Sequence, residues 1–191
     1  MKLRASIPVV PAVRPACAML LLAFVSSGCG YSLAGRGSFL PSSIKVVGVP
    51  QFVNNTPVFE VEKKITARVQ SEFIGRGKYK VRTDVTPESK DVDALLLGEI
   101  SSITVMPSAV TEERQASSYS IILTAKIEFR DVKADKVLWS NPAMQFREEF
   151  EVSNTTNVTD ASAFFGSDQN ALERMATEFA RTVVSAILEA F

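Results

Sequence analysis

The 191-residue chain contains no histidine. This absence removes the commonest general base, the Ser-His and Cys-His nucleophile pairs and the usual zinc ligand. The two cysteines are too few for a cysteine-rich metal site or a disulfide framework. The 21 basic and 21 acidic residues cancel to a formal net charge of zero, so the composition gives no basic footprint for nucleic acid. An enzyme would have to work with carboxylates, Lys or Tyr alone. We predict a protein that is not an enzyme, with no catalytic residues, no metal, no cofactor and no nucleic-acid partner.

The chain also lacks an apolar run long enough for a transmembrane helix, which needs about 20 residues. Its uninterrupted apolar run covers only residues 16–25. The basic residues Lys2, Arg4 and Arg14 precede this run, and the small residues 26–28 follow it. A positive segment, a short apolar segment and a small-residue segment, in that order, are the three parts of a secretory signal peptide. A permanent transmembrane segment is the weaker alternative.

Cys29 follows these small residues directly. The pair Gly28-Cys29 resembles the end of a bacterial lipobox, in which the cysteine thiol is acylated and becomes the first mature residue. We therefore predict a lipoprotein signal peptide at residues 1–28, lipidation at Cys29 and a single domain at residues 29–191. The alternative is an ordinary signal peptide with Cys29 as a free thiol. Because Cys17 would leave with the signal, the mature chain should contain no disulfide.

Two amphipathic helices are predicted in the mature chain. The first should begin at Pro57, with Thr56 as its N-cap, and end near Gly75 or Gly77. The second should begin near Asp168. Apolar residues recur at three- and four-residue steps in both helices, which indicates faces that pack on a core. These residues are Val58, Val61, Ile65, Val69 and Phe73 in the first helix and Leu172, Met175, Ala176, Phe179, Val183, Ile187 and Phe191 in the second.

The remaining pattern predicts strands at residues 44–52, 79–83, 93–105, 121–130 and 146–152, with a further short apolar segment at 137–139. Gly98 suggests a bulge or a close backbone approach. Residues 153–167 are rich in Ser, Thr and Asn and are predicted to be a loop. The fold class is α+β, with two helices packed on one face of a four- to five-stranded, mostly antiparallel sheet. The other face of that sheet is partly exposed and is a candidate binding surface.

Several segments of the mature chain resemble the lipopolysaccharide-assembly lipoprotein (LptE) family. They are CGYSL at residues 29–33, LPSSIKV at 40–46 and ALLLGEI at 94–100, and the resemblance extends through the first helix, residues 119–129 and the terminal helix. It implies an outer-membrane lipoprotein, lipid-anchored on the periplasmic side, where Gly30 permits export. It further implies that the protein sits inside an LptD-type β-barrel translocon, assists folding of that barrel and helps deliver lipopolysaccharide to the cell surface.

The resemblance also implies one contact residue. In studied members of the family, a basic residue on the loop between the two long strands is linked to lipopolysaccharide binding. Here that loop is residues 106–118, and Arg114 is its only basic residue. Arg114 is therefore the candidate lipopolysaccharide contact. The alternative is a simple solvated side chain at the tip of the loop.

Two other functions remain open at this stage. The protein could be a non-catalytic auxiliary lipoprotein of another envelope transport or secretion complex. It could also be an envelope hydrolase that uses a carboxylate pair, for which Glu148, Glu149 and Glu151 form the densest acidic cluster. Such a pair would need to lie in a pocket with raised pKa values.

Overall fold

The computed structural model describes residues 40–76, 78–110, 116–151 and 160–190. The predicted signal peptide and Cys29 lie outside these residues. Helices and strands follow one another in the order β1 (Val46–Gly48), β2 (Val53–Asn54), α2 (Val61–Gly75), β3 (Lys80–Arg82), β4 (Ala94–Val110), β5 (Ala116–Asp131), β6 (Lys136–Glu151), α3 (Ala161–Ser167) and α4 (Gln169–Leu188).

The sheet is built on three long antiparallel strands, β4, β5 and β6. Three short strands pair in parallel: β1 and β2 lie one after the other along β4, and β3 lies beside β1. A parallel neighbour needs a crossover connection, and α2 supplies it between β1 and β3. The predicted α+β class is confirmed. The sheet has six strands instead of four or five, because the N-terminal segments add short parallel ones.

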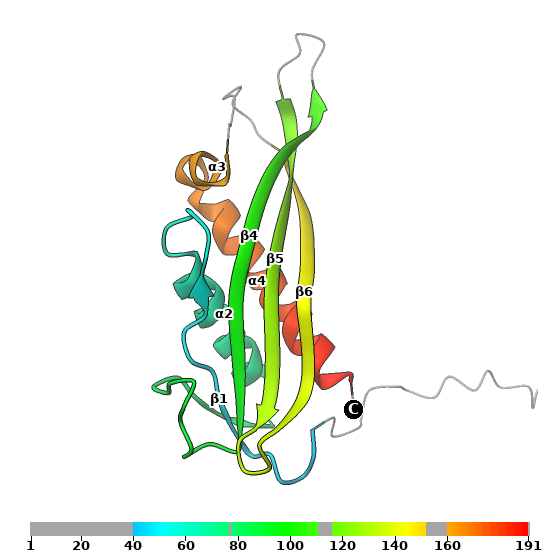
Figure 1. Cartoon of the computed structure of the whole chain (residues 1–191). Coiled ribbons are helices and arrows are strands. Elements are labelled where there is room, and N and C mark those ends of the chain that lie inside the picture. Colours follow the sequence, from blue (N-terminus) through cyan, green and yellow to red (C-terminus); the bar gives the residue numbers. More distant parts are fainter. Residues whose placement is uncertain (1–39, 77, 111–115, 152–159, 191) are drawn as a thin grey trace, which may run out of the picture. The chain divides into compact units, whose positions relative to one another are not determined.

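Helices α2 and α4 lie side by side on one face of the sheet (Figure 1). The apolar residues predicted to face the core do so: all five of α2 and its approach, and the α4 series from Leu172 to Ile187, are buried. Phe191 lies outside the described residues. Phe179 is fully buried in the middle of α4, and its ring meets the Phe146 ring of β6 edge to face at 6.1 Å. The core therefore lies between the helix pair and the inner face of the long strands.

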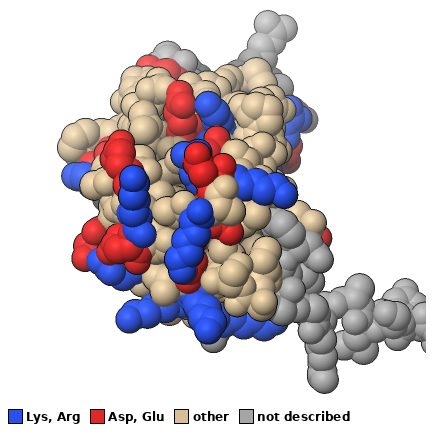
Figure 2. Space-filling view, turned by 60° about the horizontal axis from the view of Figure 1, so that its bottom comes forward, with Lys and Arg blue, Asp and Glu red and all other residues tan. Residues whose placement is uncertain are grey.

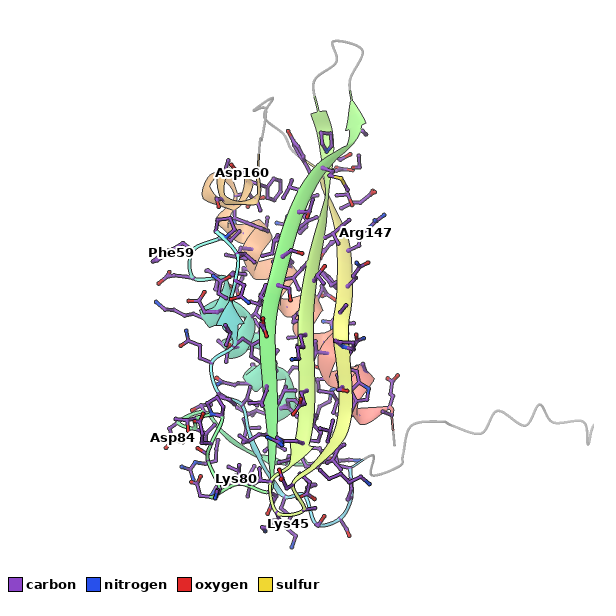
Figure 3. The ribbon with its side chains drawn as sticks, in the orientation of Figure 1. Lys45, Phe59, Lys80, Asp84, Arg147 and Asp160 are labelled. Atoms are coloured by element: carbon purple, nitrogen blue, oxygen red, sulfur yellow. The ribbon has the colours of Figure 1, made fainter. Side chains whose placement is uncertain are left out.

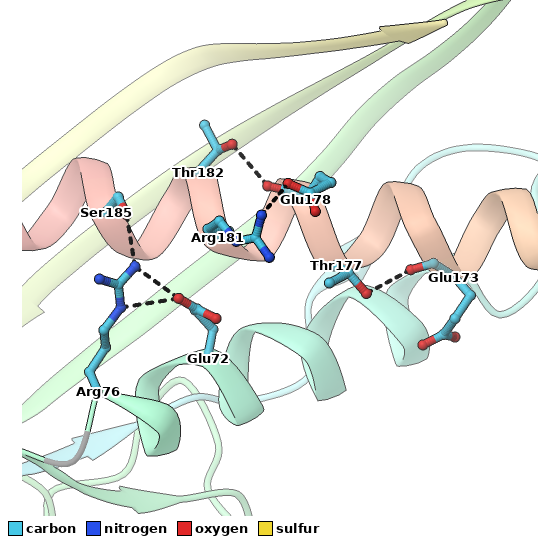
Figure 4. Close-up of polar contacts among 8 residues, drawn as sticks. All are labelled: Glu72, Arg76, Glu173, Thr177, Glu178, Arg181, Thr182 and Ser185. Atoms are coloured by element: carbon cyan, nitrogen blue, oxygen red, sulfur yellow. Dashed lines mark hydrogen bonds and ion pairs between the residues drawn. The ribbon is translucent and has the colours of Figure 1, made fainter. Parts of the chain in front are cut away.

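The polar edge of the helix pair is shown in Figure 4. The Arg76 guanidinium bonds to Glu72 on α2 and to the Ser185 hydroxyl on α4, at 2.8 Å in each case. The Thr177 and Thr182 hydroxyls donate to backbone carbonyls four residues earlier in α4. These groups are at least partly exposed, and exposed ion pairs of this kind add little stability. The apolar seam beneath them holds the two helices together.

The strand predicted at residues 44–52 is shorter in the structure. Pro50 has no N–H to give to a ladder, and the N–H of Phe52 donates to the Thr66 hydroxyl of α2 at 2.9 Å. The chain therefore leaves the sheet after Gly48 and rejoins it at β2. The Phe52 ring packs on the backbone of Gly98, where a Cβ would lie 2.3 Å from the ring. The predicted close backbone approach at Gly98 is confirmed.

The predicted start of the first helix is wrong. The helix begins at Val61, after Glu60 in a left-handed conformation with φ of 59°. The Thr56 hydroxyl instead donates to Asn54 and accepts the N–H of Val58, which makes a local turn. Ser and Thr favour such turns as much as helix caps. Thr56 therefore stabilises a turn before the helix instead of capping it. The predicted end at Gly75 is confirmed.

The predicted loop at residues 106–118 is mostly strand. The β4–β5 ladder continues through the pairs Met106–Ser120, Pro107–Tyr119, Ala109–Ser118 and Val110–Ala116. The ladder has register shifts on either side of Ala109. This irregular pairing accommodates Pro107, which has no N–H to donate to the ladder. In the same way, residues 137–139 and 146–152 belong to one continuous strand, because Pro142 falls at a register shift on the outermost strand β6.

The prediction of a loop at residues 153–167 is wrong at its end. Asp160 caps α3 by accepting the N–H of Ala163 at 2.8 Å. Phe164 and Phe165 are buried, and the Phe164 ring meets the rings of Tyr119 and Phe150. Burial of these two rings stabilises a helix of only seven residues that its Ser and Ala content alone did not suggest. Helix α4 begins at Gln169, close to the predicted start, and Asp168 is its N-cap.

Candidate functional site: the outer face of the sheet

The outer face is the surface of β4, β5 and β6 that points away from α2 and α4. On β5, the odd-numbered residues 119–129 are buried against the helices, so the even-numbered residues 118–130 form the outer face. The strand register places Ser102, Thr104 and Met106 of β4 next to Thr124, Ile122 and Ser120 of β5. Gln145, Arg147 and Glu149 of β6 lie on the other side of the same three β5 residues.

On β4 and β5, the half of the outer face toward the hairpin is rich in hydroxyl groups and has no charge, whereas β6 adds the charged residues Arg147, Glu149 and Glu151 beside it. Residues 100–110 and 116–125 contain no charged side chain. Ser102 and Thr104 are exposed, and the Ser108 and Ser118 hydroxyls lie 3.2 Å apart. Met106 places an apolar side chain, 45% exposed, among them. Hydroxyls can exchange water for a partner at lower desolvation cost than charges, and interface centres are depleted in charge.

Sequence reasoning did not single out this hydroxyl-rich surface, although the two uncharged runs were visible in the sequence. The position of the surface depends on the register, which brings the runs side by side on β4 and β5. Figure 1 shows these strands running on beyond α3, so that the surface continues on a projecting hairpin.

The other half of the outer face is charged and contains a cleft of about 230 Å³. Its lining residues include Leu97, Gly98, Pro50, Pro87, Glu99, Lys126 and Glu128. Its carboxylates have partners in the fold: Glu99 accepts from the Asn55 amide at 2.6 Å, and Glu128 lies 3.7 Å from Arg130. Lys126 stands opposite Glu99 in the ladder. The acids that line the cleft are therefore held by groups of the fold itself.

Asp93 fixes the end of the sheet below this cleft. Its carboxylate accepts the N–H groups of Lys45 and Val46, both at 2.9 Å, and pairs with the Lys133 ammonium. The hydrogen bond from Lys133, followed by those from the two backbone N–H groups, lowers the pKa of Asp93 from 3.8 to about 2. One nearly buried carboxylate thus joins the start of β1, the start of β4 and the β5–β6 turn.

Glu148 is a half-buried carboxylate between β6 and α4. Unlike Glu149 and Glu151, which are exposed on the outer face, it points toward the helices, and its Oε2 atom has no hydrogen-bond partner among the described residues. Burial raises the pKa of Glu148, and the negative charge of Glu178 raises it further, whereas Arg174 opposes the shift. The structure therefore does not bring the predicted cluster of three acids together at one site.

We predict that Glu148→Gln raises the thermal midpoint of unfolding at neutral pH. The raised pKa means that the folded state prefers the protonated carboxyl, so the stability of the natural protein falls as pH rises through that pKa. The variant should not lose stability over this pH range. Its thermal midpoint should therefore exceed that of the natural protein by a few degrees at neutral pH, and this difference should disappear in acid, where Glu148 is protonated in the folded and the unfolded state. Thermal unfolding followed by circular dichroism at several pH values measures this. Glu149→Gln, which is exposed on the opposite face, should have no such effect.

The two residues singled out from the sequence, Cys29 and Arg114, both lie outside the described residues. Within the described ranges, no group of three or more His, Cys, Asp or Glu side chains is placed to hold a metal ion. None of the helices described is long and apolar enough to cross a membrane.

Comparison with models of protein families identifies the family of this chain. The family model for LptE, lipopolysaccharide-assembly, matches residues 44–187, from the approach to β1 to the end of α4. The chain belongs to the LptE family of lipopolysaccharide-assembly proteins. No curated protein sequence matches it.

Solved structures with similar folds include several lipoproteins. The rare lipoprotein B from Shewanella oneidensis is 11% identical, with a TM-score of 0.44, and the match covers 73% of this chain and 92% of that one. A lipoprotein B from Nitrosomonas europaea is 13% identical, with a TM-score of 0.46 and coverage of 81% and 87%. The PelC dodecamer from Paraburkholderia phytofirmans matches at 14% identity, with a TM-score of 0.46 and coverage of 81% and 94%.

Proposed function

We propose that this protein is an outer-membrane lipoprotein, anchored through acylated Cys29 on the periplasmic side, that sits inside an LptD-type β-barrel translocon. There it assists folding of the barrel and helps deliver lipopolysaccharide to the cell surface. Membership of the LptE family supports this proposal. The alternative, an auxiliary lipoprotein of another envelope complex, would share the anchor but have a different partner.

The observation that carries the proposal is the uncharged, hydroxyl-rich surface that β4 and β5 form on the outer face toward the hairpin. A protein held within a water-filled barrel must contact a polar inner wall. A surface of Ser and Thr side chains can form hydrogen bonds with such a wall without burying unpaired charge. The inner face of the same strands is filled by the protein's own helices, so the outer face is the sheet surface left for a partner.

A photo-cross-linking amino acid at Ser108 or Ala116 should trap the barrel protein in intact outer membranes. Both positions lie near the end of the hairpin, and Ser108 is exposed. The measurement is the identity of the adduct by mass spectrometry. Asp135, 87% exposed in the β5–β6 turn at the other end of the sheet, is a matched control that should not give the same adduct.

The cross-link also separates the two candidate partners. A different envelope protein trapped at Ser108 would support the auxiliary-lipoprotein alternative. No barrel adduct from either position, with the protein present in the membrane, would contradict placement inside the barrel.

Arg114 is proposed as a lipopolysaccharide contact, because it is the basic residue between β4 and β5. Arg114→Asp should weaken binding of lipopolysaccharide to the purified protein by about 1.5–3 kcal/mol, the range for one charge-assisted hydrogen bond. Titration calorimetry or a fluorescence assay can measure the change, and the thermal midpoint should stay the same. Equal affinity in the variant would exclude Arg114 as a ligand while leaving the role inside the barrel intact.

A further inference from the structure

Four lysines gather at the end of the sheet opposite the hairpin, and we call this surface the lysine end. Lys45 precedes β1, Lys80 begins β3, Lys136 begins β6, and Lys90 lies in the connection between β3 and β4. The N–H of Lys80 donates to the carbonyl of Lys45 at 2.8 Å, so two of these lysines lie on neighbouring segments. Figure 3 shows Lys45 and Lys80 at this end of the molecule.

The ammonium groups of these four lysines are not used by the fold. All four side chains are exposed, and none forms an ion pair with another described residue. In Figure 2, which brings this end forward, lysine and arginine side chains stand out across the surface and along the lower margin of the view. The lysines are therefore free to meet an external anion.

Most acids at the lysine end already have partners. Arg82 pairs with Asp84 and Asp91, and Arg130 pairs with Asp135.

Two further acids at this end also have partners within the fold. Asp93 pairs with Lys133, and Asp131 accepts the backbone N–H groups of Lys133 and Ala134. Glu88 is the one acid of this end that remains exposed without an ion pair among the described residues. The seven basic residues named at this end exceed the six acids by one, so the net charge is weakly positive. Among the described residues of this end, the four lysines without an ion pair outnumber the two acids without one, Glu88 and Asp131.

The chain enters the domain at this same end. Leu40 is buried, and the N–H of Ile44 donates to the carbonyl of Pro41, which fixes the entry beside Lys45. Leu40 is 11 residues after Cys29. A chain of that length spans at most about 40 Å when fully extended. If Cys29 carries the lipid, its tether holds the lysine end closer to the headgroups than the hairpin.

We propose that the lysine end docks on the anionic phospholipid surface of the membrane that holds the lipid anchor. The inference rests on acylation of Cys29, which is part of the proposed function. In the free, anchored protein, the domain then stands end-on to the bilayer with its outer face and hairpin exposed to a partner. Each lysine near an anionic membrane surface strengthens binding about fivefold, and the attraction fades within a Debye length. The acyl chains supply attachment, and the lysines supply orientation.

The test uses the mature acylated protein reconstituted into vesicles of phosphatidylethanolamine with or without phosphatidylglycerol. Because Cys29 is blocked by acylation, a cysteine introduced at Ala134 gives a single fluorescent label at the lysine end, and one at Ser108 labels the hairpin. Quenching by lipids with spin-labelled headgroups reports which end lies at the surface. We expect strong quenching at position 134 only with phosphatidylglycerol, lost at high salt, and weak quenching at position 108 throughout.

Charge variants identify the surface responsible. In the triple variant Lys45→Gln, Lys80→Gln and Lys136→Gln, the docked population should fall about tenfold or more, given the contribution of each lysine. The control Lys63→Gln, Lys64→Gln and Lys126→Gln removes the same net charge from other surfaces and should keep the quenching. Thermal midpoints of both variants verify that the domain remains folded.

Each contrary result has a distinct meaning. Equal quenching at position 134 in both lipid mixtures, or equal loss in both triple variants, would overturn docking by the lysine end while leaving the anchor intact. An intact mass without acyl groups on Cys29 would contradict the anchor itself, and the docking proposal would fall with it.

Discussion

Replacement of Phe179 by alanine is expected to lower the free energy of unfolding by about 3–5 kcal/mol. The ring is fully buried in the middle of α4 and contacts the Phe146 ring of β6. Removing it leaves a cavity between the helix and the sheet that close-packed neighbours cannot fill completely. Urea unfolding followed by circular dichroism gives the free energy directly.

Ile74→Ala is the matched control for this prediction. Ile74 lies on α2 and its side chain is 58% exposed, so truncation should cost little. If Phe179→Ala were no more destabilising than Ile74→Ala, α4 would not pack on the sheet, and its apolar face would become available to a partner.

Asp93→Asn should lower the free energy of unfolding at pH 7 by about 2–3 kcal/mol. The expected size follows from a pKa that falls from 3.8 to about 2 on folding, at about 1.36 kcal/mol per pKa unit. The carboxylate side chain is only 12% exposed, so solvent screens it little. The amide oxygen can still accept both backbone N–H groups, which share one oxygen of Asp93, but the amide cannot hold the ammonium of Lys133 as an ion pair.

The effect of Asp93→Asn on stability should depend on pH. Because folding lowers the pKa of Asp93, its contribution is complete above the unfolded value of 3.8 and is lost as pH falls toward about 2. The difference between the natural protein and Asp93→Asn should therefore shrink over that interval. A difference that stays constant from pH 7 to pH 2 would contradict a role for the charge. Asp84→Asn, at an exposed carboxylate, should change stability little at any pH.

Local periodicity in the sequence was sufficient to predict the elements that form the core. The alternation from Ile121 to Phe129 and the spacing from Leu172 to Ile187 are both confirmed by burial. These patterns succeed because each residue's environment depends on its own strand or helix. Gly98 was also identified, although only the fold reveals that the Phe52 ring occupies the space of the missing side chain.

The missed elements depended on distant partners. Helix α3 is stabilised by contacts of Phe164 with Tyr119 and Phe150, which lie on two different strands. The extent of the β4–β5 ladder depended on pairing across the hairpin, which a single-strand pattern does not contain. In such cases tertiary contacts override local composition.

The candidate site was predictable only in part. A partly exposed sheet face followed from the alternation, but locating its uncharged surface on β4 and β5 and its charged cleft required the register. Glu148 and Glu178 belong to different elements, so their mutual effect on pKa could not be inferred from the sequence. Asp93 likewise obtains its partners from three separate segments of the chain.

Strand β4 has a mechanical consequence, because it runs the whole way from the lysine end to the hairpin. Its 17 residues span about 55 Å at the usual rise of a strand, which exceeds the full thickness of a bilayer, about 40–45 Å. The strand thus acts as a rigid spacer that sets how far the hairpin stands from the tethered end. Shortening all three long strands by two residues would reduce that reach by about 7 Å and preserve both faces. Shortening them by one would turn the hydroxyl groups toward the core.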